Sequence, residues 1–283
     1  MLALRRDLPL VLMLALASGV AAPMAARAQG KLDAHYSVKL AGIPIGKGTW
    51  LVEVTDTHFT SVAHGGTSGL LRAFSSGQGE SSAIGTLQAG QPVSSIYSSI
   101  IATSKKSDEV HLTVANGVVK DSRLEPPLDT DPERVPLTDE HRKGILDPMT
   151  ASLLRTAGTG DPLSQEACNR TTSIFDGRLR YDLQLAFKRL DHVKADKGYT
   201  GPVVVCAVYF SPIAGYIPSR AAIRYVSKLR DIEVWLAPIA GTRVLVPYRV
   251  QGPTPIGQVV MEATEFVTTA LPTRASANGV KTQ

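Results

Sequence analysis

Apolar and polar residues alternate along most of the chain, which is the pattern of β-strands with one buried face. The alternation runs through residues 36–40 and resumes at 50–54, on either side of a glycine-rich stretch at 42–48. Residues 203–210 are apolar on both faces, which predicts a strand that is covered on both sides. Together with similar segments elsewhere, this pattern predicts a mainly β protein with about ten strands.

Short turn signals separate the predicted strands. Asn116-Gly117 is a two-residue hairpin signal, because both residues tolerate positive φ. The connections are too short for the helical crossovers that parallel strands need. We therefore expect curved antiparallel sheets in a barrel-like or half-barrel architecture, which would enclose either a packed interior or a ligand cavity.

One or two short helices complete the predicted fold. Asp147 can cap a helix that begins at Pro148, where the missing donor of proline costs nothing, and Gly158 ends its apolar face. We expect this helix to be amphipathic and to lie on a sheet. Residues 219–230 fit a short helix followed by a strand.

The strands are predicted to form a single β-rich domain over residues 29–270. A stretch at 121–145 is rich in proline and charge and shows no periodicity. It is expected to be a loop that joins two sub-halves, 31–120 and 146–270. The polar tail at 271–283 is expected to be disordered.

The N-terminus has the features of a secretory signal peptide. Arg5 and Arg6 form a positive region, residues 8–22 are apolar or small, and Ala26-Arg27-Ala28 fits the A-x-A pattern before a cleavage site. We expect cleavage after Ala28 and export of the mature chain. The apolar stretch is shorter than a bilayer span and no second one follows, so no transmembrane segment is expected after cleavage.

Net charge argues against a nucleic-acid partner. Residues 1–28 carry three basic and one acidic side chain, so their removal lowers the formal net charge from +5 to +3. Nucleic-acid binding needs a concentrated basic face, which this chain lacks. Residues 188–197 do hold five basic side chains, but two aspartates are interleaved with them. This mixture favours a solvated hairpin tip over contact with an anionic lipid or sugar polymer.

Cys168 and Cys206 both lie in the part of the chain that is predicted to be exported. An even pair in an oxidising compartment favours a structural disulfide. The alternative is a redox-active or nucleophilic thiol, but the C-x-x-C spacing and a nearby histidine are missing.

The sequence contains no motif for metal, cofactor or nucleotide chemistry. The six histidines show no spacing of three or four residues and no H-E-x-x-H, so no zinc site and no cofactor are expected. The segment 66–69 (GTSG) lacks the spacing of a nucleophile elbow. A hydrolase would therefore need residues assembled from distant segments.

Five aromatic side chains on predicted strands are candidates for lining a ligand cavity. The alternative is that they pack in the core, which is the more frequent role of large aromatic side chains in strands. The candidate ligand-binding residues are Trp50, Tyr209, Tyr216, Trp235 and Tyr248.

Six short segments carry a further signal through their order along the chain. They are 42–46 (GIPIG), 147–154 (DPMTASLL), 173–183 (SIFDGRLRYDL), 198–206 (GYTGPVVVC), 233–236 (EVWL) and 246–249 (VPYR). In this order they resemble the DUF3108 family of exported bacterial proteins. The resemblance implies a periplasmic, mainly antiparallel β protein of curved or barrel-like form. It carries over no catalytic residue, because the family is one of unknown function.

The leading hypothesis is a periplasmic, non-enzymatic binding protein for an apolar or amphiphilic envelope ligand, such as a lipid or a lipid-linked component. It depends on the predicted export, the lack of a catalytic motif and the strands that are apolar on both faces. One alternative is an envelope scaffold that binds a protein partner through an edge strand or the charged loop at 121–143. The other is the hydrolase with a site assembled from distant segments.

Overall fold

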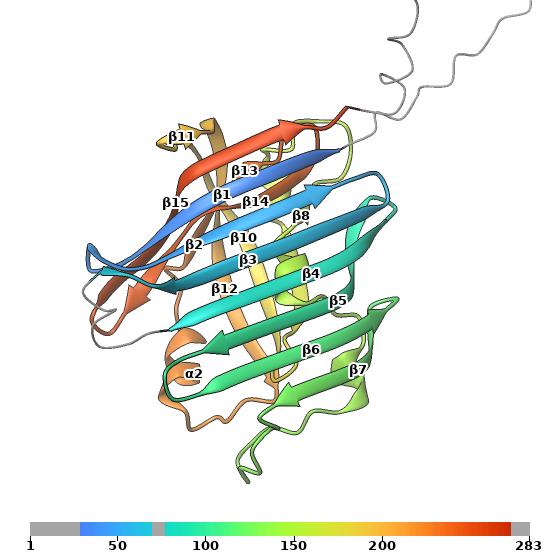
Figure 1. Ribbon diagram of the computed structural model, residues 1–283, viewed down its shortest axis with the longest axis vertical. Helices are drawn as coiled ribbons and strands as arrows, with labels where there is room; N and C mark the ends of the chain where they lie inside the picture. Colours follow the sequence, from blue (N-terminus) through green and yellow to red (C-terminus); the bar gives the residue numbers. More distant parts are fainter. Residues whose placement is uncertain (1–28, 70–76, 273–283) are drawn as a thin grey trace, which may run out of the picture.

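The structure is a computed structural model that describes residues 29–69 and 77–272 (Figure 1). Fifteen β-strands in these residues belong to one sheet, and two short α-helices and two 3₁₀ helices connect them. The predicted signal peptide at 1–28 and most of the predicted tail at 271–283 lie outside the described residues.

The first seven strands form a meander in which each strand pairs with the next. Tight turns make this possible, since both residues of Ala41-Gly42, Ala89-Gly90 and Asn116-Gly117 have positive φ. The hairpin predicted at Asn116-Gly117 is confirmed. Only the beginning of the glycine-rich stretch at 42–48 belongs to a turn, because Ala41-Gly42 reverses the chain at once and residues 43–48 pair as strand. The strands are β1 Gly30–Leu40, β2 Ile43–Val54, β3 His58–Thr67, β4 Gln78–Gln88, β5 Gln91–Ala102, β6 Ser107–Ala115 and β7 Val118–Glu125.

The second half of the chain returns to the first through its last strand, which pairs with β1 along the whole length of β1. The N- and C-terminal strands therefore lie side by side in the middle of the sheet. The eight strands of this half are β8 Leu154–Arg155, β9 Arg170–Phe175, β10 Arg180–Lys194, β11 Lys197–Gly198, β12 Thr200–Ala214, β13 Glu233–Pro238, β14 Val244–Thr254 and β15 Gly257–Ala270.

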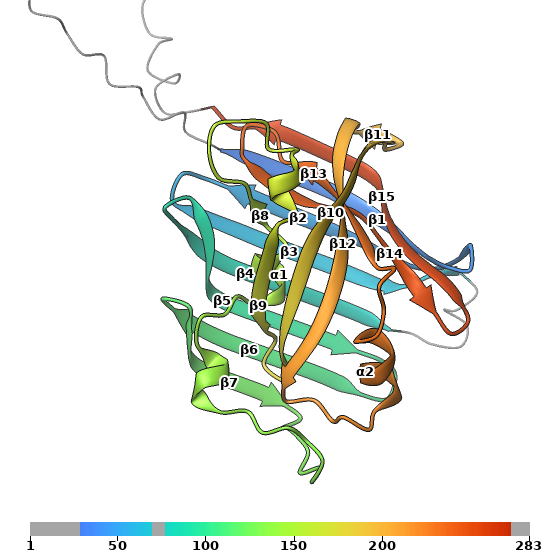
Figure 2. The same cartoon turned by 180° about the vertical axis from the view of Figure 1, so that it is seen from behind.

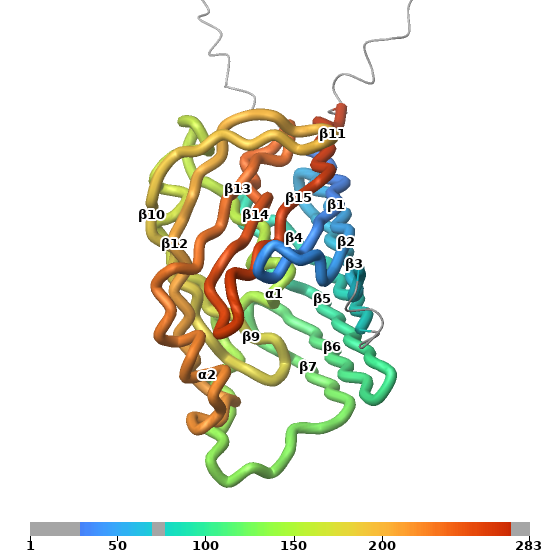
Figure 3. The backbone as a smooth tube through the Cα atoms, turned by 90° about the vertical axis from the view of Figure 1, so that its left-hand side faces the viewer, coloured from blue at the N-terminus to red at the C-terminus, as the bar shows by residue number. Residues whose placement is uncertain are grey.

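The sheet curves into a half-barrel that does not close. Its strand order is β7-β6-β5-β4-β3-β2-β1-β15-β14-β13-β12-β10-β9, so β7 and β9 are the two ends of the path. All pairings along the path are antiparallel, and the short β11 adds a parallel pairing to β15. β1–β7 form one layer and β10, β12, β13 and β14 the facing layer (Figure 3). The predicted mainly β, barrel-like fold is confirmed.

Side chains from successive strands fill one end of the space between the layers. Leu32 pairs across to Val52, and the same row continues through Ser61, Ala83 and Tyr97 to Leu112 on β6. All six residues are buried. Because neighbouring residues on paired strands share a face, this row forms a packed core that fixes the curvature of the first layer.

A short helix, α1 Pro148–Ala151, lies between the two layers (Figure 2). The capping by Asp147 and the start at Pro148 are confirmed, but the predicted end at Gly158 is wrong. The chain leaves the helix after one turn, and β8 pairs with β14. Leu153 and Leu154 are both buried, but they lie in different apolar clusters. Successive side chains of an extended chain point to opposite sides and can reach two clusters, whereas one amphipathic face of a helix can reach only one.

Asp147 anchors α1 to the first layer although it is completely buried. Its carboxylate accepts hydrogen bonds from the Ser94 hydroxyl on β5 and from both the amide and the hydroxyl of Thr150, with the amide at 2.9 Å. The Ser94 hydroxyl in turn accepts a bond from the Asp147 amide. Burial raises the pKa of the Asp147 carboxyl, and these hydrogen bonds act in the opposite direction.

The predicted loop at 121–145 begins later than expected. β7 continues to Glu125, because its residues pair with β6 up to Glu109. The rest of the segment is irregular apart from a 3₁₀ helix, Asp139–Arg142. The short helix predicted within 219–230 is present as α2 Ala221–Val226, and the predicted strand follows as β13. None of the helices in the described residues has the length and apolar character to cross a bilayer.

The predicted disulfide is present in the structure. Cys168 follows the 3₁₀ helix Gln165–Ala167 and is bonded to Cys206 in β12, with the two Cα atoms 5.5 Å apart. Both residues are fully buried, in an apolar cluster that also contains Leu154 and Leu236. The bond therefore ties the segment before β9 to the middle of the second layer.

We predict that Cys168→Ser lowers the melting temperature of the oxidised protein. In the chain-entropy model, closing a loop with a sequence separation of 38 residues contributes about 4 kcal/mol by restricting the unfolded chain. Differential scanning calorimetry measures the effect. Reductant should lower the melting temperature of the wild type towards that of the variant and leave the variant unchanged. A wild type that is insensitive to reductant would show that the bond does not contribute.

We predict that Asp147→Asn changes the pH dependence of stability. The pKa of the Asp147 carboxyl is higher in the folded state than in the unfolded state, so deprotonation favours unfolding. The wild type therefore loses stability as the pH rises from the pKa of Asp147 in the unfolded chain to its pKa in the folded protein. The amide of the variant does not titrate. The melting temperature of the variant minus that of the wild type should therefore increase from pH 4.5 to pH 8. Parallel melting curves across this range would contradict it. Asp147→Ala, which removes the cap, should melt lower at every pH.

Candidate ligand-binding cavity

The space between the layers opens into an apolar cavity next to α1, opposite the packed end of the first layer. Its volume is about 610 Å³, within the range of typical small-molecule sites. Its walls come from β1 to β5, from α1 and from the facing strands β14 and β15. The cavity is partly open to solvent.

Three aligned glycines create this cavity. Gly48, Gly65 and Gly79 are directly paired across β2, β3 and β4, with Tyr36 on β1 at one end of the row and Ile101 on β5 at the other. This row is two pleats from the packed row that begins at Leu32. Where the packed row places side chains between the layers, the glycine row places none. The glycines therefore leave an unfilled volume between Tyr36 and Ile101.

The remaining wall is mostly apolar, and two of its polar groups are bonded to the protein. The Tyr36 hydroxyl donates to the Pro247 carbonyl at 2.7 Å, and Trp50 Nε1 donates to the Ser61 hydroxyl at 2.8 Å. Burial raises the pKa of the Tyr36 hydroxyl far above its usual value, so this hydroxyl stays neutral. Met149 on α1 and Met261 on β15 complete the wall with flexible side chains that can adapt to a ligand.

A smaller apolar hollow lies on the other side of α1. Its volume is about 200 Å³, and its wall comes from α1, β8, β9, β10, β12, β13 and β14. Ser152 and Pro247 line both this hollow and the large cavity. The two spaces are therefore neighbours that share part of their wall at the end of α1.

Of the five aromatic candidates, Trp50 lines the large cavity and the other four do not. Tyr248 is buried against Phe266, with ring centroids 5.4 Å apart. Tyr209 follows Val208, which lines the smaller hollow, so the alternation of the strand turns Tyr209 to the opposite face, where Arg230 lies over its ring. Tyr216 is half-buried after the end of β12.

Trp235 lies on the face of β13 that points away from the hollows, since its neighbours Val234 and Leu236 line the smaller one. Arg189 and Arg249 lie over its ring, at 5.3 and 4.8 Å from the centroid. Its indole nitrogen donates to Asp191 at 3.0 Å. Trp235 is thus buried as part of the main apolar core, with two guanidinium groups and one carboxylate around its ring.

Three of the five basic residues of 188–197 are paired with acids rather than grouped as a cationic patch. Lys188 and Arg189 both contact Glu233, and Lys197 contacts Glu265 at 3.1 Å. Arg189 and Lys188 hold the pKa of Glu233 below its usual value against the opposing effect of burial. These pairs favour the interpretation of this segment as a mixed-charge hairpin.

The hydrolase hypothesis gains no support from the positions of the histidines. His111 Nδ1 lies 3.1 Å from the Ser98 hydroxyl on the exposed face of β5 and β6. His64 lies 3.6 Å from Glu80. In the described part of the chain, no histidine contacts both a serine and a carboxylate, and no group of three or more potential metal ligands occurs.

The sequence contained a signal for the cavity that alternation of apolar residues alone does not reveal. Glycines recur with a period of two at 46 and 48 and again at 77 and 79, and a pair lies at 65–66. Glycine at alternate positions of adjacent strands removes side chains from one face of the sheet. The register between the strands, which the sequence does not state, is needed to see that these glycines form one row.

Two of the solved structures that match this chain are as follows. A beta-barrel-like protein of the domain of unknown function DUF1849 from Brucella abortus has 8% sequence identity and a TM-score of 0.48, with 86% of this chain and 99% of that chain covered. A candidate lipoprotein from Parabacteroides distasonis has 9% identity and a TM-score of 0.29, with coverages of 84% and 95%. The search of curated proteins gave no match.

The family comparison confirms the resemblance seen in the sequence. The model of a family described as a protein of unknown function, DUF3108, matches residues 35–264. This range includes the glycine row, α1 and both cysteines. The match covers well over half of the chain, so this protein belongs to the DUF3108 family.

Proposed function

We propose that this protein is an exported, periplasmic binding protein whose large apolar cavity holds the apolar part of an amphiphilic envelope ligand. The observation that carries the proposal is the glycine row, which leaves an apolar cavity of about 610 Å³ in a fold that packs its other end closely. Each methylene group that moves from water into such a space contributes about 0.8 kcal/mol. A lipid chain therefore gains most from this cavity.

The distribution of charge in the wall supports a ligand whose buried part is uncharged. Lys47 and His64 are the only residues with basic side chains among the described wall residues, and both are substantially exposed at the rim. None of these wall residues is acidic. An ion inside the cavity would lose its hydration without gaining a partner, whereas an alkyl chain would lose only unfavourable contact with water.

We predict that Gly79→Leu abolishes binding of the uncharged probe N-phenyl-1-naphthylamine without unfolding the protein. A Cβ at Gly79 would lie 3.6 Å from the Ile100 carbonyl oxygen and 3.7 Å from Ile101 Cγ1, which are ordinary contacts. The rest of the leucine side chain would project into the cavity. Probe fluorescence should show at least about a tenfold loss of affinity, and the melting temperature should not fall.

Glu80→Leu is the matched control for this experiment. It adds the same side chain on the adjacent residue of β4, whose Cβ points to the opposite face of the sheet. This variant should bind the probe as the wild type does. Equal affinity of Gly79→Leu and Glu80→Leu would overturn the assignment of the cavity as the binding site.

We also predict that the full chain, expressed in a Gram-negative bacterium, is recovered from the periplasmic fraction with Gln29 as its first residue. The reason is the charged, apolar and small-residue pattern of residues 1–28. Osmotic-shock fractionation followed by intact mass measurement tests it. A protein that retains residue 1 in the cytoplasmic fraction would contradict the proposed location.

A further inference from the structure

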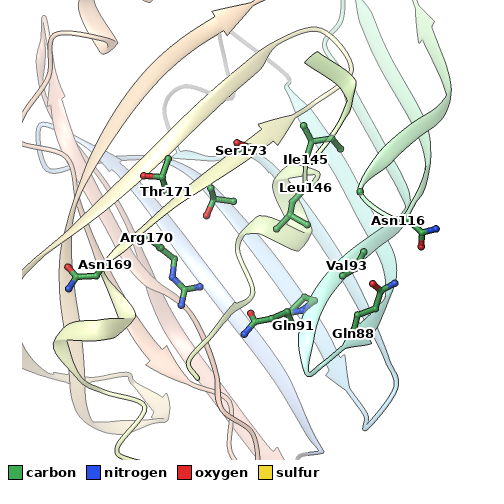
Figure 4. A pocket seen from close by; sticks show the side chains of 14 residues that line it. Gln88, Gln91, Val93, Asn116, Ile145, Leu146, Asn169, Arg170, Thr171 and Ser173 are labelled. Atoms are coloured by element: carbon green, nitrogen blue, oxygen red, sulfur yellow. The ribbon is translucent and has the colours of Figure 1, made fainter. Parts of the chain in front are cut away.

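A second, polar pocket opens at the edge where β9 approaches the turns of the first layer (Figure 4). Its volume is about 710 Å³. Three parts of the chain form it, namely the β4–β5 turn, the β6–β7 turn with the adjoining segment 144–146, and residues 169–173 at the start of β9.

The wall of this pocket offers hydrogen bonds and one positive charge. Side-chain amides come from Gln88, Gln91, Asn116 and Asn169, and hydroxyls come from Thr171 and Thr172. The Ser173 hydroxyl, also in the wall, donates to Asp182 at 2.9 Å. None of the described wall residues is acidic. Such a wall suits an anion that also accepts several hydrogen bonds.

The positive charge is Arg170, whose guanidinium points into the pocket towards Gln91 (Figure 4). Its Nη2 donates to the Arg155 carbonyl at 3.0 Å, while its buried Nε has no acceptor. Within the described residues no carboxylate lies at ion-pair distance from Arg170, in contrast to Arg178, which contacts Asp108 at 3.1 Å. Burial lowers the pKa of Arg170, as expected for a cation without a counter-ion.

A second guanidinium lies near this pocket. Arg155 packs against the β4–β5 turn so closely that a Cβ on Gly90 would lie 2.5 Å from Arg155 Cζ. Gly90 also has a positive φ of 78°, so glycine is favoured here for two reasons. The pocket edge therefore carries two cations within a group of neutral side chains.

The polar pocket adjoins the apolar spaces. Thr172 lines both the polar pocket and the smaller hollow, and Ser152 and Pro247 line both that hollow and the large cavity. Arg170 lies two residues before Thr172 on the same face of β9. A polar group held at Arg170 would therefore be next to the apolar interior.

We propose that the polar pocket binds the phosphate or carboxylate group of an anionic ligand, with Arg170 as its main contact. The inference rests on the proposed function in one respect, since the anion is taken to be the head group of the amphiphile whose apolar part lies in the large cavity. The same chemistry could come from a free phosphate ester, so the experiment separates the two sources. Arginine is suited to this role because its guanidinium donates two parallel hydrogen bonds to such groups.

The test compares dodecyl phosphate, dodecanol and glycerol phosphate by isothermal titration calorimetry. The wild type should bind dodecyl phosphate at least about tenfold more tightly than dodecanol, because only the phosphate gains charge-assisted bonds. Arg170→Gln should lose this preference and retain its affinity for dodecanol. Arg123→Gln, which removes the same charge from an exposed residue of β7, should behave as the wild type.

Each outcome decides the proposal. Equal binding of dodecyl phosphate and dodecanol by the wild type overturns it, and this comparison holds even if Arg170→Gln does not fold. A preference that survives in folded Arg170→Gln also overturns it. Binding of glycerol phosphate that depends on Arg170, without binding of either alkyl compound, supports the anion site. The same result overturns the proposal that the large cavity binds an apolar chain. Loss of all alkyl binding in Gly79→Leu with retained binding of glycerol phosphate shows that the two sites are separate.

Discussion

The structure depends on one buried carboxylate that holds a short segment inside a half-open sheet. Asp147 joins α1 to β5 through Ser94 and closes the first turn of the helix through Thr150. The segment that it positions lines all three hollows, with residues 144–146 at the polar pocket, Met149 at the large cavity and Leu154 at the smaller hollow. Without this anchor the segment around α1 would lose its fixed position between the layers, and the walls that it contributes to these spaces would not keep their shape.

The cavity persists because the sheet cannot close over it. Strands in a ladder stay about 4.8 Å apart whatever their side chains, so replacing side chains by glycine does not draw the strands together. The facing layer is held at its distance by α1 and by the packed row that includes Val52 and Tyr97. The folded protein therefore lacks the dispersion contacts that side chains at the glycine positions would make with the surrounding wall. A ligand that fills the space would supply such contacts.

Local patterns in the sequence were sufficient for the fold class but not for the site. Alternation and the Asn116-Gly117 turn predicted antiparallel hairpins, since both depend on neighbouring residues. The length of α1 was mispredicted because β8 pairs with β14, a contact between residues about ninety positions apart. The same holds for the aromatic candidates. Strand alternation places Trp235 and its neighbours on opposite faces of β13, but which of these faces lines a hollow depends on β12 and β14. Arg170 could not be recognised, because the absence of a nearby acid is a property of the folded chain.

The glycine row and Arg170 share one physical property. Each works against stability: the glycines leave a hollow in the interior, and Arg170 places a partly buried cation away from any acid among the described residues. Elsewhere the same chain fills its core, as Leu32 shows, and places several of its arginines beside carboxylates, as Arg178 shows. Departures from good packing and charge pairing are expected where a protein binds something. Both departures lie in walls linked by the hollow behind α1, which is the arrangement that one ligand with an apolar and an anionic end requires.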